Sequence, residues 1–437
     1  MKWMRGLWVG ASLLLVLSSC AKNPTGSIKD AGVYSPLITG ISADHEPAVR
    51  DTTNEFTAIV TNVSGLSITY HWSVSAGTLI DSTGATAVWR APNAVGTYPV
   101  TVSIVSGSYF KTMTFQVYVD NEFARWTQSP EVQFDPSPIQ TGGVLFAQFR
   151  NIATGAADIY SLSAPGLSPV QLTQDFARIT SPSMQSDGLQ IAFAGRRTAS
   201  DSTSIWLLPG TGGDPSMALR AVSWYPDQLT LANPRFSRTA RWLLYNSDST
   251  SVFNPKPWFR DIDLLFTNTP PNRVLADNVE GFGTFLMPNW GPDVDGNGLP
   301  DSIVCAGYKF FGNTNQQPRG LFKFPTSPEQ GSAAQWLADS TATEPDWSAD
   351  GSYIIYTKRN PIGGDRDIWI INAGSSDPST AKRVTFGPAD DSRPRFSPDG
   401  TAIFFVSNRV DHYGLNGIYN TERRGTNIWS VTRFDRP

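Results

Sequence analysis

The sequence is poor in cysteine, in histidine and in runs of like charge. It has 2 Cys and 3 His among 437 residues, charged residues make up 16% of the chain, and the formal net charge is −4. No run of Lys or Arg stands out, which argues against a nucleic-acid partner. After the first twenty residues, no long stretch shows the period of 3.6 residues that an amphipathic helix requires.

The sequence also lacks the common catalytic motifs. It contains no Gly-x-Ser-x-Gly elbow, no His-Glu-x-x-His and no phosphate-binding glycine loop. We therefore expect a protein that is not an enzyme. A carbohydrate-active lyase or hydrolase remains the enzymatic alternative, because its two carboxylates need not be close in sequence.

Turn-forming and aromatic residues are plentiful instead. The chain has 37 Gly and 32 Pro, and 12% of its residues are aromatic. This composition favours many short strands, so we predict an all-β protein. A chain of this length is expected to form more than one domain.

The first residues predict export and lipidation. Lys2 and Arg5 give residues 1–19 a basic start, and the apolar segment that follows is too short to span a bilayer. The sequence Leu17-Ser18-Ser19-Cys20 resembles the lipobox of bacterial lipoproteins, which implies that Cys20 is acylated and holds the protein to a membrane. An ordinary secretory signal with an incidental cysteine is the alternative.

The lipobox resemblance also implies a location in the cell envelope. Ala21 follows Cys20 where Asp would favour the inner membrane, so the expected location is the outer membrane, on its periplasmic or its outer surface. Residues 20–35 are polar and turn-rich and predict a tether. With Cys20 lipidated, Cys305 has no disulfide partner, and its apolar surroundings predict a buried thiol.

A pattern of proline, aromatic residue, Asp-Gly turn and apolar strand recurs through residues 122–437. Its copies begin near Ser137, Ser181, Asn233, Met287, Glu344 and Arg393. The marker prolines lie 44 to 57 residues apart at Pro138, Pro182, Pro234, Pro288, Pro345 and Pro394. A period near fifty with several strands in each unit is typical of a β-propeller.

Each repeat continues with a third strand, and all but the last continue with a fourth. Third strands are predicted at "DIYSLS", "SIWLLPG", "DIDLLFTN", "GLFKFPT", "DIWIINA" and "NIWSVTR". The last repeat lacks its fourth strand, but the segment that begins at Arg125 matches the fourth strand that begins at Arg383. We therefore predict that an N-terminal strand completes the last blade and closes the ring, leaving no exposed sheet edge.

The turns that follow Glu344 and Arg393 read Pro-x-aromatic-Ser-x-Asp-Gly, and the third strand from Asp367 reads Asp-Ile-Trp. With these signatures the six repeats resemble the TolB-like β-propeller family, strongly from Ser181, Glu344 and Arg393 and more weakly from Ser137, Asn233 and Met287. The resemblance implies a six-bladed propeller of four-stranded blades over residues 122–437. It also suggests a scaffold or accessory role in an envelope protein assembly, an inference by analogy because fold does not fix function.

Residues 36–121 have a different pattern. Trp72 and Trp89 precede an Ala91-Pro92 break, and apolar residues then alternate from Tyr98 to Ile104. This segment resembles bacterial Ig-like or PKD-like sandwiches, a fold that commonly acts as a spacer. A binding role is the alternative.

Long connections between second and third strands predict a loop-rich face of the propeller that binds a partner. Aromatic and Arg side chains are favoured at binding surfaces. The same face receives the starts of the inner strands, with Arg178, Glu344 and Arg393. The candidate partner-binding residues are Phe253, Trp258, Phe259, Arg260, Arg319, Arg393, His412, Tyr413, Tyr419, Arg423 and Arg424.

Three identities for this face stay open. An envelope protein partner is the first, a glycan or peptide is the second, and aromatic residues that only cover the blade tops are the third.

The opposite face carries one acidic loop, "DVDGNGLPD". Asp293, Asp295, Asn297 and Asp301 offer side-chain oxygens, and Leu299 would offer its carbonyl. This spacing lets a short loop surround a hard cation, and it resembles the DxDxNGxxD calcium loops of extracellular repeats. We expect a structural Ca²⁺ here, and a solvated acidic turn is the alternative.

Overall fold

The computed structural model describes an all-β protein. The described residues are 36–61, 67–219, 231–247, 255–265, 272–273, 284–311, 315–326, 335–338, 341–360, 364–387, 389–409 and 426–437. Within these ranges the only helical turns are the 3-10 segments η1 (Ile262–Leu264) and η3 (Pro378–Thr380). No helix in the described part of the chain has the length and apolarity to cross a membrane.

The N-terminal unit is a sandwich of two four-stranded sheets. One has the order β1 (Leu37–Ala43), β3 (Thr53–Thr61), β6 (Thr86–Arg90), β5 (Thr78–Asp81); the other has β2 (Ala48–Val49), β8 (Tyr109–Asp120), β7 (Gly96–Ser106), β4 (Thr69–Val74). Both sheets contribute to one core around Phe56, Trp72 and Trp89. Along β7 every second residue from Val100 to Ile104 is buried, because successive strand residues point to opposite faces.

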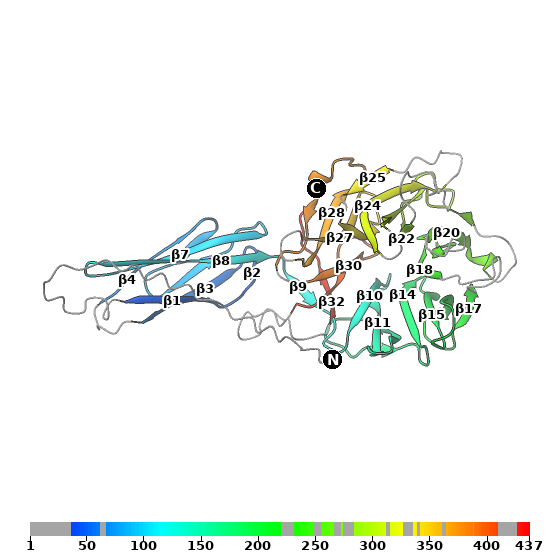
Figure 1. Ribbon diagram of the computed structural model, residues 1–437, viewed down its shortest axis with the longest axis horizontal. Coiled ribbons are helices and arrows are strands. Elements are labelled where there is room, and N and C mark those ends of the chain that lie inside the picture. Colours follow the sequence, from blue (N-terminus) through cyan, green and yellow to red (C-terminus); the bar gives the residue numbers. More distant parts are fainter. Residues whose placement is uncertain are drawn as a thin grey trace, which may run out of the picture.

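Six further four-stranded sheets follow in the described chain, and Figure 1 shows them around a ring. The first sheet comprises β10 (Gln133–Pro138), β11 (Val144–Asn151), β12 (Ala156–Leu162) and β13 (Val170–Gln171), and the second comprises β14 (Arg178–Met184), β15 (Gln190–Arg196), β16 (Ser204–Pro209) and β17 (Ser216–Leu219). The third comprises β18 (Leu231–Phe236), β19 (Trp242–Ser247), β20 (Lys256–Asp261) and β21 (Asn272–Arg273), and the fourth comprises β22 (Thr284–Trp290), β23 (Ser302–Phe311), β24 (Asn315–Pro325) and β25 (Gln335–Ala338). The fifth comprises β26 (Ala342–Trp347), β27 (Tyr353–Arg359), β28 (Arg366–Asn372) and β29 (Lys382–Arg383).

The sixth sheet closes the ring. It consists of β30 (Asp391–Phe396), β31 (Ile403–Ser407), β32 (Asn427–Val431) and the N-terminal strand β9 (Phe123–Arg125). Val431 pairs with Phe123 and Trp429 with Arg125, so the predicted closure by an N-terminal strand is confirmed. The strand ends at Arg125, where the prediction had it begin. The first strands of successive sheets contact one another in cyclic order, β30 with β10 included.

Two predicted strand positions are wrong. The first marker proline is Pro136, because the bulge of β10 falls between Phe134 and Ser137, and Pro138 lies two residues too late. The third strand of the third sheet is β20, ending at Asp261, where the prediction had it begin. Trp258 pairs with Tyr245 just as Trp206 pairs with Phe193 in the preceding sheet, so the tryptophan marks the correct register.

The sandwich joins the ring through a buried polar cluster. Asp120, the last residue of β8, accepts hydrogen bonds from the Asn121 and Phe386 N–H groups, at 2.8 and 3.1 Å. The Arg409 guanidinium lies 4.0 Å from Asp120 and 2.6 Å from Asp391. Burial raises the pKa of Asp120 to about 7, although Arg409 acts in the opposite direction. The end of the sandwich is thus fixed to the closing sheet by charge as well as by chain connection.

Candidate functional site

Each innermost strand of the ring contains a β-bulge at the same place. The residue before each marker proline has a positive φ, between 52° and 56°. Residues with a side chain rarely adopt this left-handed conformation, and a following proline disfavours it further. The six residues are Asp135, Ser181, Asn233, Met287, Glu344 and Arg393. A strained conformation repeated around the ring is held by its neighbours, and it directs these side chains toward the axis.

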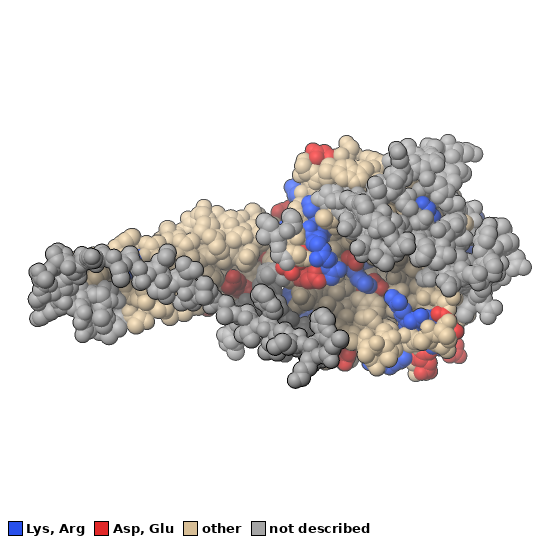
Figure 2. Space-filling view, in the orientation of Figure 1, with Lys and Arg blue, Asp and Glu red and all other residues tan. Residues whose placement is uncertain are grey.

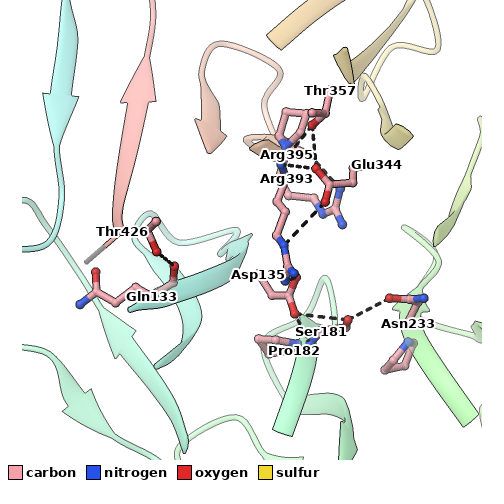
Figure 3. Close-up of polar contacts among 12 residues, drawn as sticks. Gln133, Asp135, Ser181, Pro182, Asn233, Glu344, Thr357, Arg393, Arg395 and Thr426 are labelled. Atoms are coloured by element: carbon pink, nitrogen blue, oxygen red, sulfur yellow. Dashed lines mark hydrogen bonds and ion pairs between the residues drawn. The ribbon is translucent and has the colours of Figure 1, made fainter. Parts of the chain in front are cut away.

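Five of the six side chains form a polar chain around the axis (Figure 3). Arg393 donates to Asp135 through Nη1, and its Nε lies 3.7 Å from a Glu344 oxygen. Asp135 accepts the Ser181 N–H at 2.8 Å, and the Ser181 hydroxyl lies 3.0 Å from the Asn233 side-chain oxygen. Residues from sheets at opposite ends of the repeat region are therefore joined directly.

Charge pairing controls the ionisation of this group. Burial would raise the pKa of Asp135, but Arg393, the Ser181 N–H and other cations outweigh it, so the pKa lies below its ordinary value. Burial would lower the pKa of Arg393, but Asp135 and Glu344 raise it. Arg393 is thus a fixed cation between two carboxylates. Its side chain is 35% exposed, which leaves one side open toward the adjoining cavity.

That cavity, of about 350 Å³, lies between the first, second, fifth and sixth sheets. Its lining includes four arginines, namely Arg178, Arg196, Arg366 and Arg393, and one acidic residue, Asp390. Asp390 is bound by Arg366 through two hydrogen bonds of 2.7 Å. Arg178 is exposed, and Arg196 has a buried Nε with no partner among the described residues.

Arg178 and Arg196 stand directly opposite each other on β14 and β15. Like charges in such a cross-strand pair are destabilising, unless an acidic group lies between them. Figure 2 shows Lys and Arg side chains in a broken band across the propeller face turned to the viewer, beside a group of acidic residues. The cavity can therefore bind an acidic group, and Arg178 and Arg196 supply charge that no described residue neutralises.

The predicted partner-binding residues are placed differently. Trp258, Phe259 and Arg260 belong to β20 and not to a loop, and Phe259 and Arg260 are only 4% and 7% exposed. Phe259 packs into a core with Trp290, so this part of the predicted surface is wrong. The backbone of Arg319 lies in β24, in an extended hairpin where a loop was predicted. Outside the described residues lie Cys20, Phe253, His412, Tyr413, Tyr419, Arg423 and Arg424.

The acidic loop lies between β22 and β23. Carboxylate oxygens of Asp293, Asp295 and Asp301 all lie within 4.8 Å of one another. Asp293 accepts the Gly298 N–H at 2.8 Å through Oδ2, whereas its buried Oδ1 has no partner in the described structure. The Asn297 side-chain oxygen accepts the Leu299 N–H. The residues present fit a hard cation, since oxygen atoms converge and one buried oxygen is unsatisfied.

A comparison with protein-family models and with curated proteins finds no match. Solved structures similar to this chain include TolB from Acinetobacter baumannii, at 15% identity and a TM-score of 0.45, covering 83% of this chain and 80% of that chain. A putative TolB from Agrobacterium tumefaciens has 17% identity and a TM-score of 0.29, covering 70% and 76%.

The β-propeller domain of the Trilobed protease from Pyrococcus furiosus has 10% identity and a TM-score of 0.36, covering 63% of this chain and 77% of that chain. The structural neighbours thus include TolB-like β-propellers. At these identities and scores they carry no argument about function.

Proposed function

We propose that this chain is a lipid-anchored cell-envelope protein that binds a protein partner through the loop face of a six-bladed propeller. The six sheets are its blades, and the N-terminal Ig-like sandwich acts as a spacer above Cys20 and the tether. The protein works by binding rather than by catalysis. The proposal rests mainly on the arginine-lined cavity, where Arg178 lies opposite Arg196. The positive charge of these two side chains favours binding of an acidic group from a partner.

The partner segment that fits is acidic. Arginine binds carboxylates with two parallel hydrogen bonds, which gives geometric specificity as well as charge. Arg393 and Arg366 are already paired with carboxylates, so they shape the cavity, while Arg178 and Arg196 contact the partner. A surface that captures an acidic glycan is the second candidate, supported by the same charge.

The first experiment is co-purification from detergent-solubilised envelopes. We compare the wild type with an Arg178→Gln, Arg196→Gln double variant. A matched control carries Arg90→Gln and Arg241→Gln, which remove two exposed arginines from the sandwich and from the other face. We expect a specific protein partner with the wild type and the control, and its loss in the cavity variant.

The cavity variant should fold at least as well as the wild type, because it removes a like-charge pair. Equal recovery of the partner by both variants would contradict the proposal. Saturable binding of an acidic oligosaccharide without any protein partner would favour the glycan candidate.

The anchor is tested separately. Cys20→Ser should leave the chain without lipid and release it from the membrane fraction, because acyl chains supply the membrane affinity. Fractionation and mass spectrometry of the N-terminal peptide measure this. Retention of the Cys20→Ser variant at the wild-type level would refute the anchor.

We further propose that the loop from Asp293 to Asp301 binds a structural Ca²⁺. Asp293, Asp295, Asn297 and Asp301 would supply side-chain oxygens, and Leu299 its carbonyl. When bound, the ion would offset the mutual repulsion of the converging carboxylates. The loop packs against neighbouring blades, since Thr239 donates to the Gly298 carbonyl at 2.9 Å and Pro292 lies against Gly351. Ordering this loop would thus stiffen three adjacent blades.

Removal of calcium should lower the melting temperature of the wild type. A ligand at a hundred times its Kd adds about 2.7 kcal/mol of stability, which a chelator would abolish. Asp293→Asn and Asp301→Asn should lose this response. Asp187→Asn changes an exposed turn aspartate in the second sheet, where Asp187 accepts the Leu189 N–H, and should keep the response. A wild type whose melting is indifferent to calcium and chelator would overturn the assignment.

A further inference from the structure

A second set of six residues lines the axis at the other end of the ring. They follow the bulge residues by two positions, so they lie roughly 7 Å deeper along each strand. The set comprises Ser137, Ser183, Arg235, Asn289, Asp346 and Arg395. Together with neighbouring aromatic residues they surround a cavity of about 210 Å³ at the end of the ring where first and second strands are joined.

Three members of this set connect neighbouring strands by accepting hydrogen bonds. Ser137 accepts the Met184 N–H, Ser183 accepts the Phe236 N–H and Asp346 accepts the Phe396 N–H, at 3.4, 3.2 and 2.7 Å. Arginine has no acceptor atom, so Arg235 and Arg395 cannot serve in this way. At two of the six positions the repeat therefore replaces a structural acceptor with a cation.

Both arginines are buried, and Arg395 is incompletely paired. Arg235 and Arg395 are 7% and 9% exposed. Each donates through Nη1 to backbone carbonyls, Arg395 to Pro394 at 2.8 Å and Arg235 to Pro234 at 3.0 Å. The Arg395 Nε is buried and has no partner in the part of the chain that the structure describes.

The cavity has more positive than negative charge. Its one lining carboxylate, Asp346, already accepts from the Asn289 side chain and from the Phe396 N–H. Asp135 also interacts electrostatically with Arg235 and Arg395, but it forms its ion pair with Arg393. Arg238 adds a third guanidinium at the mouth, where it donates to the Trp347 and Ala349 carbonyls. Burial and then the charge of Arg395 lower the pKa of Arg235 to about 9, although Asp135 and Asp346 act in the opposite direction.

We propose that this cavity binds a small oxyanion, a phosphate or carboxylate group, between Arg235 and Arg395. A guanidinium matches such a group with two parallel hydrogen bonds. Trp290 and Trp347 also line the cavity, and burial of the two arginines strengthens the charge interaction. The volume suits a small molecule and excludes a folded partner. The site is independent of the proposed partner surface, which lies at the other end of the ring.

The test is a thermal-shift and calorimetric titration of the full chain with inorganic phosphate, sulfate and succinate, at ionic strength held constant with sodium chloride. We expect at least one of these anions to raise the melting temperature in a saturable way. Phosphate or sulfate as the tighter ligand assigns a tetrahedral anion, and succinate assigns a carboxylate. No stabilisation beyond that of chloride by any of the three would overturn the proposal.

Variants locate the site. Arg395→Met should bind at least tenfold more weakly, and without anion its stability should change little, because relief of the repulsion with Arg235 offsets the lost attraction to buried Asp346. A purely structural Arg395 would instead make this variant unstable and would contradict the proposal. Arg395→Lys keeps the charge and the fold but loses the planar fork, so it should weaken binding as well. The Arg178→Gln, Arg196→Gln variant should bind like the wild type, and equal weakening there would place the anion at the partner surface.

Discussion

Replacement of Arg409 by Met should lower the free energy of unfolding by about 3–5 kcal/mol at pH 7, because it leaves buried carboxylates without a counter-charge. Arg409 is 6% exposed, its Nη2 lies 2.6 Å from Asp391, and its guanidinium stacks 3.7 Å from the centre of the Phe123 ring. Asp391 is 1% exposed, so solvent cannot replace the lost partner. Urea denaturation followed by tryptophan fluorescence measures the loss.

The cost of Arg409→Met should shrink as the pH falls from 7 to 5. The unpaired carboxylates acquire a raised pKa in the folded state, so the folded variant binds protons that the unfolded chain does not. Asp120→Asn is the matched control, since its amide oxygen can still accept from the Phe386 N–H. In the wild type the pKa of Asp120 is about 7, so its contribution favours folding at low pH and is lost as the pH rises through 7.

Relative to Asp120→Asn, the wild type should therefore become less stable between pH 5 and pH 8. An Arg409→Met variant with wild-type stability, or with a deficit that grows on acidification, would show that the cluster does not hold the junction.

Trp429→Ala should destabilise the ring by about 3–5 kcal/mol, as expected for a large buried aromatic side chain. Trp429 is 1% exposed and stands in β32 between Phe405 and Arg125, so it packs both the closing strand and its neighbour. Trp336, which is 40% exposed in β25, is the control, and Trp336→Ala should change stability little. Equal losses for the two variants, measured by calorimetry, would show that the closing sheet is not specially sensitive.

The architecture could be predicted from the sequence because each strand and turn has a signal in its own residues. Proline, turn and apolar strand recur in each unit, and the alternation near Val100 is a strand signal in itself. Prediction and structure differ where a local signal is ambiguous. Pro136 and Pro138 both fit the marker, and only the bulge register of β10 distinguishes them. The pattern predicts a loop at Trp258, whereas its alignment with Trp206, Trp369 and Trp429 in the third strands places it in a strand.

The candidate sites depend on ring geometry, which local patterns do not contain. Arg178 and Arg196 meet because a hairpin sets them in register, and that register includes a bulge. Arg235 and Arg395 line one cavity although they belong to different sheets, so only closure of the ring brings them together. The acidic loop is the opposite case, because its spacing within nine residues already predicted the convergence of Asp293, Asp295 and Asp301.

The position of Asp120 has a mechanical consequence. The sandwich leads directly into β9, so tension applied from the N-terminal side reaches the ring at the strand that closes it. A three-residue antiparallel pairing would peel apart one hydrogen bond at a time. Asp120, bound to Phe386 and close to Arg409, precedes that strand in the path of the load, and so does the Arg50–Asp435 ion pair of 3.0 Å. The junction therefore bears the force before the closing strand does, and a pull from the N-terminal side is transmitted to the whole ring.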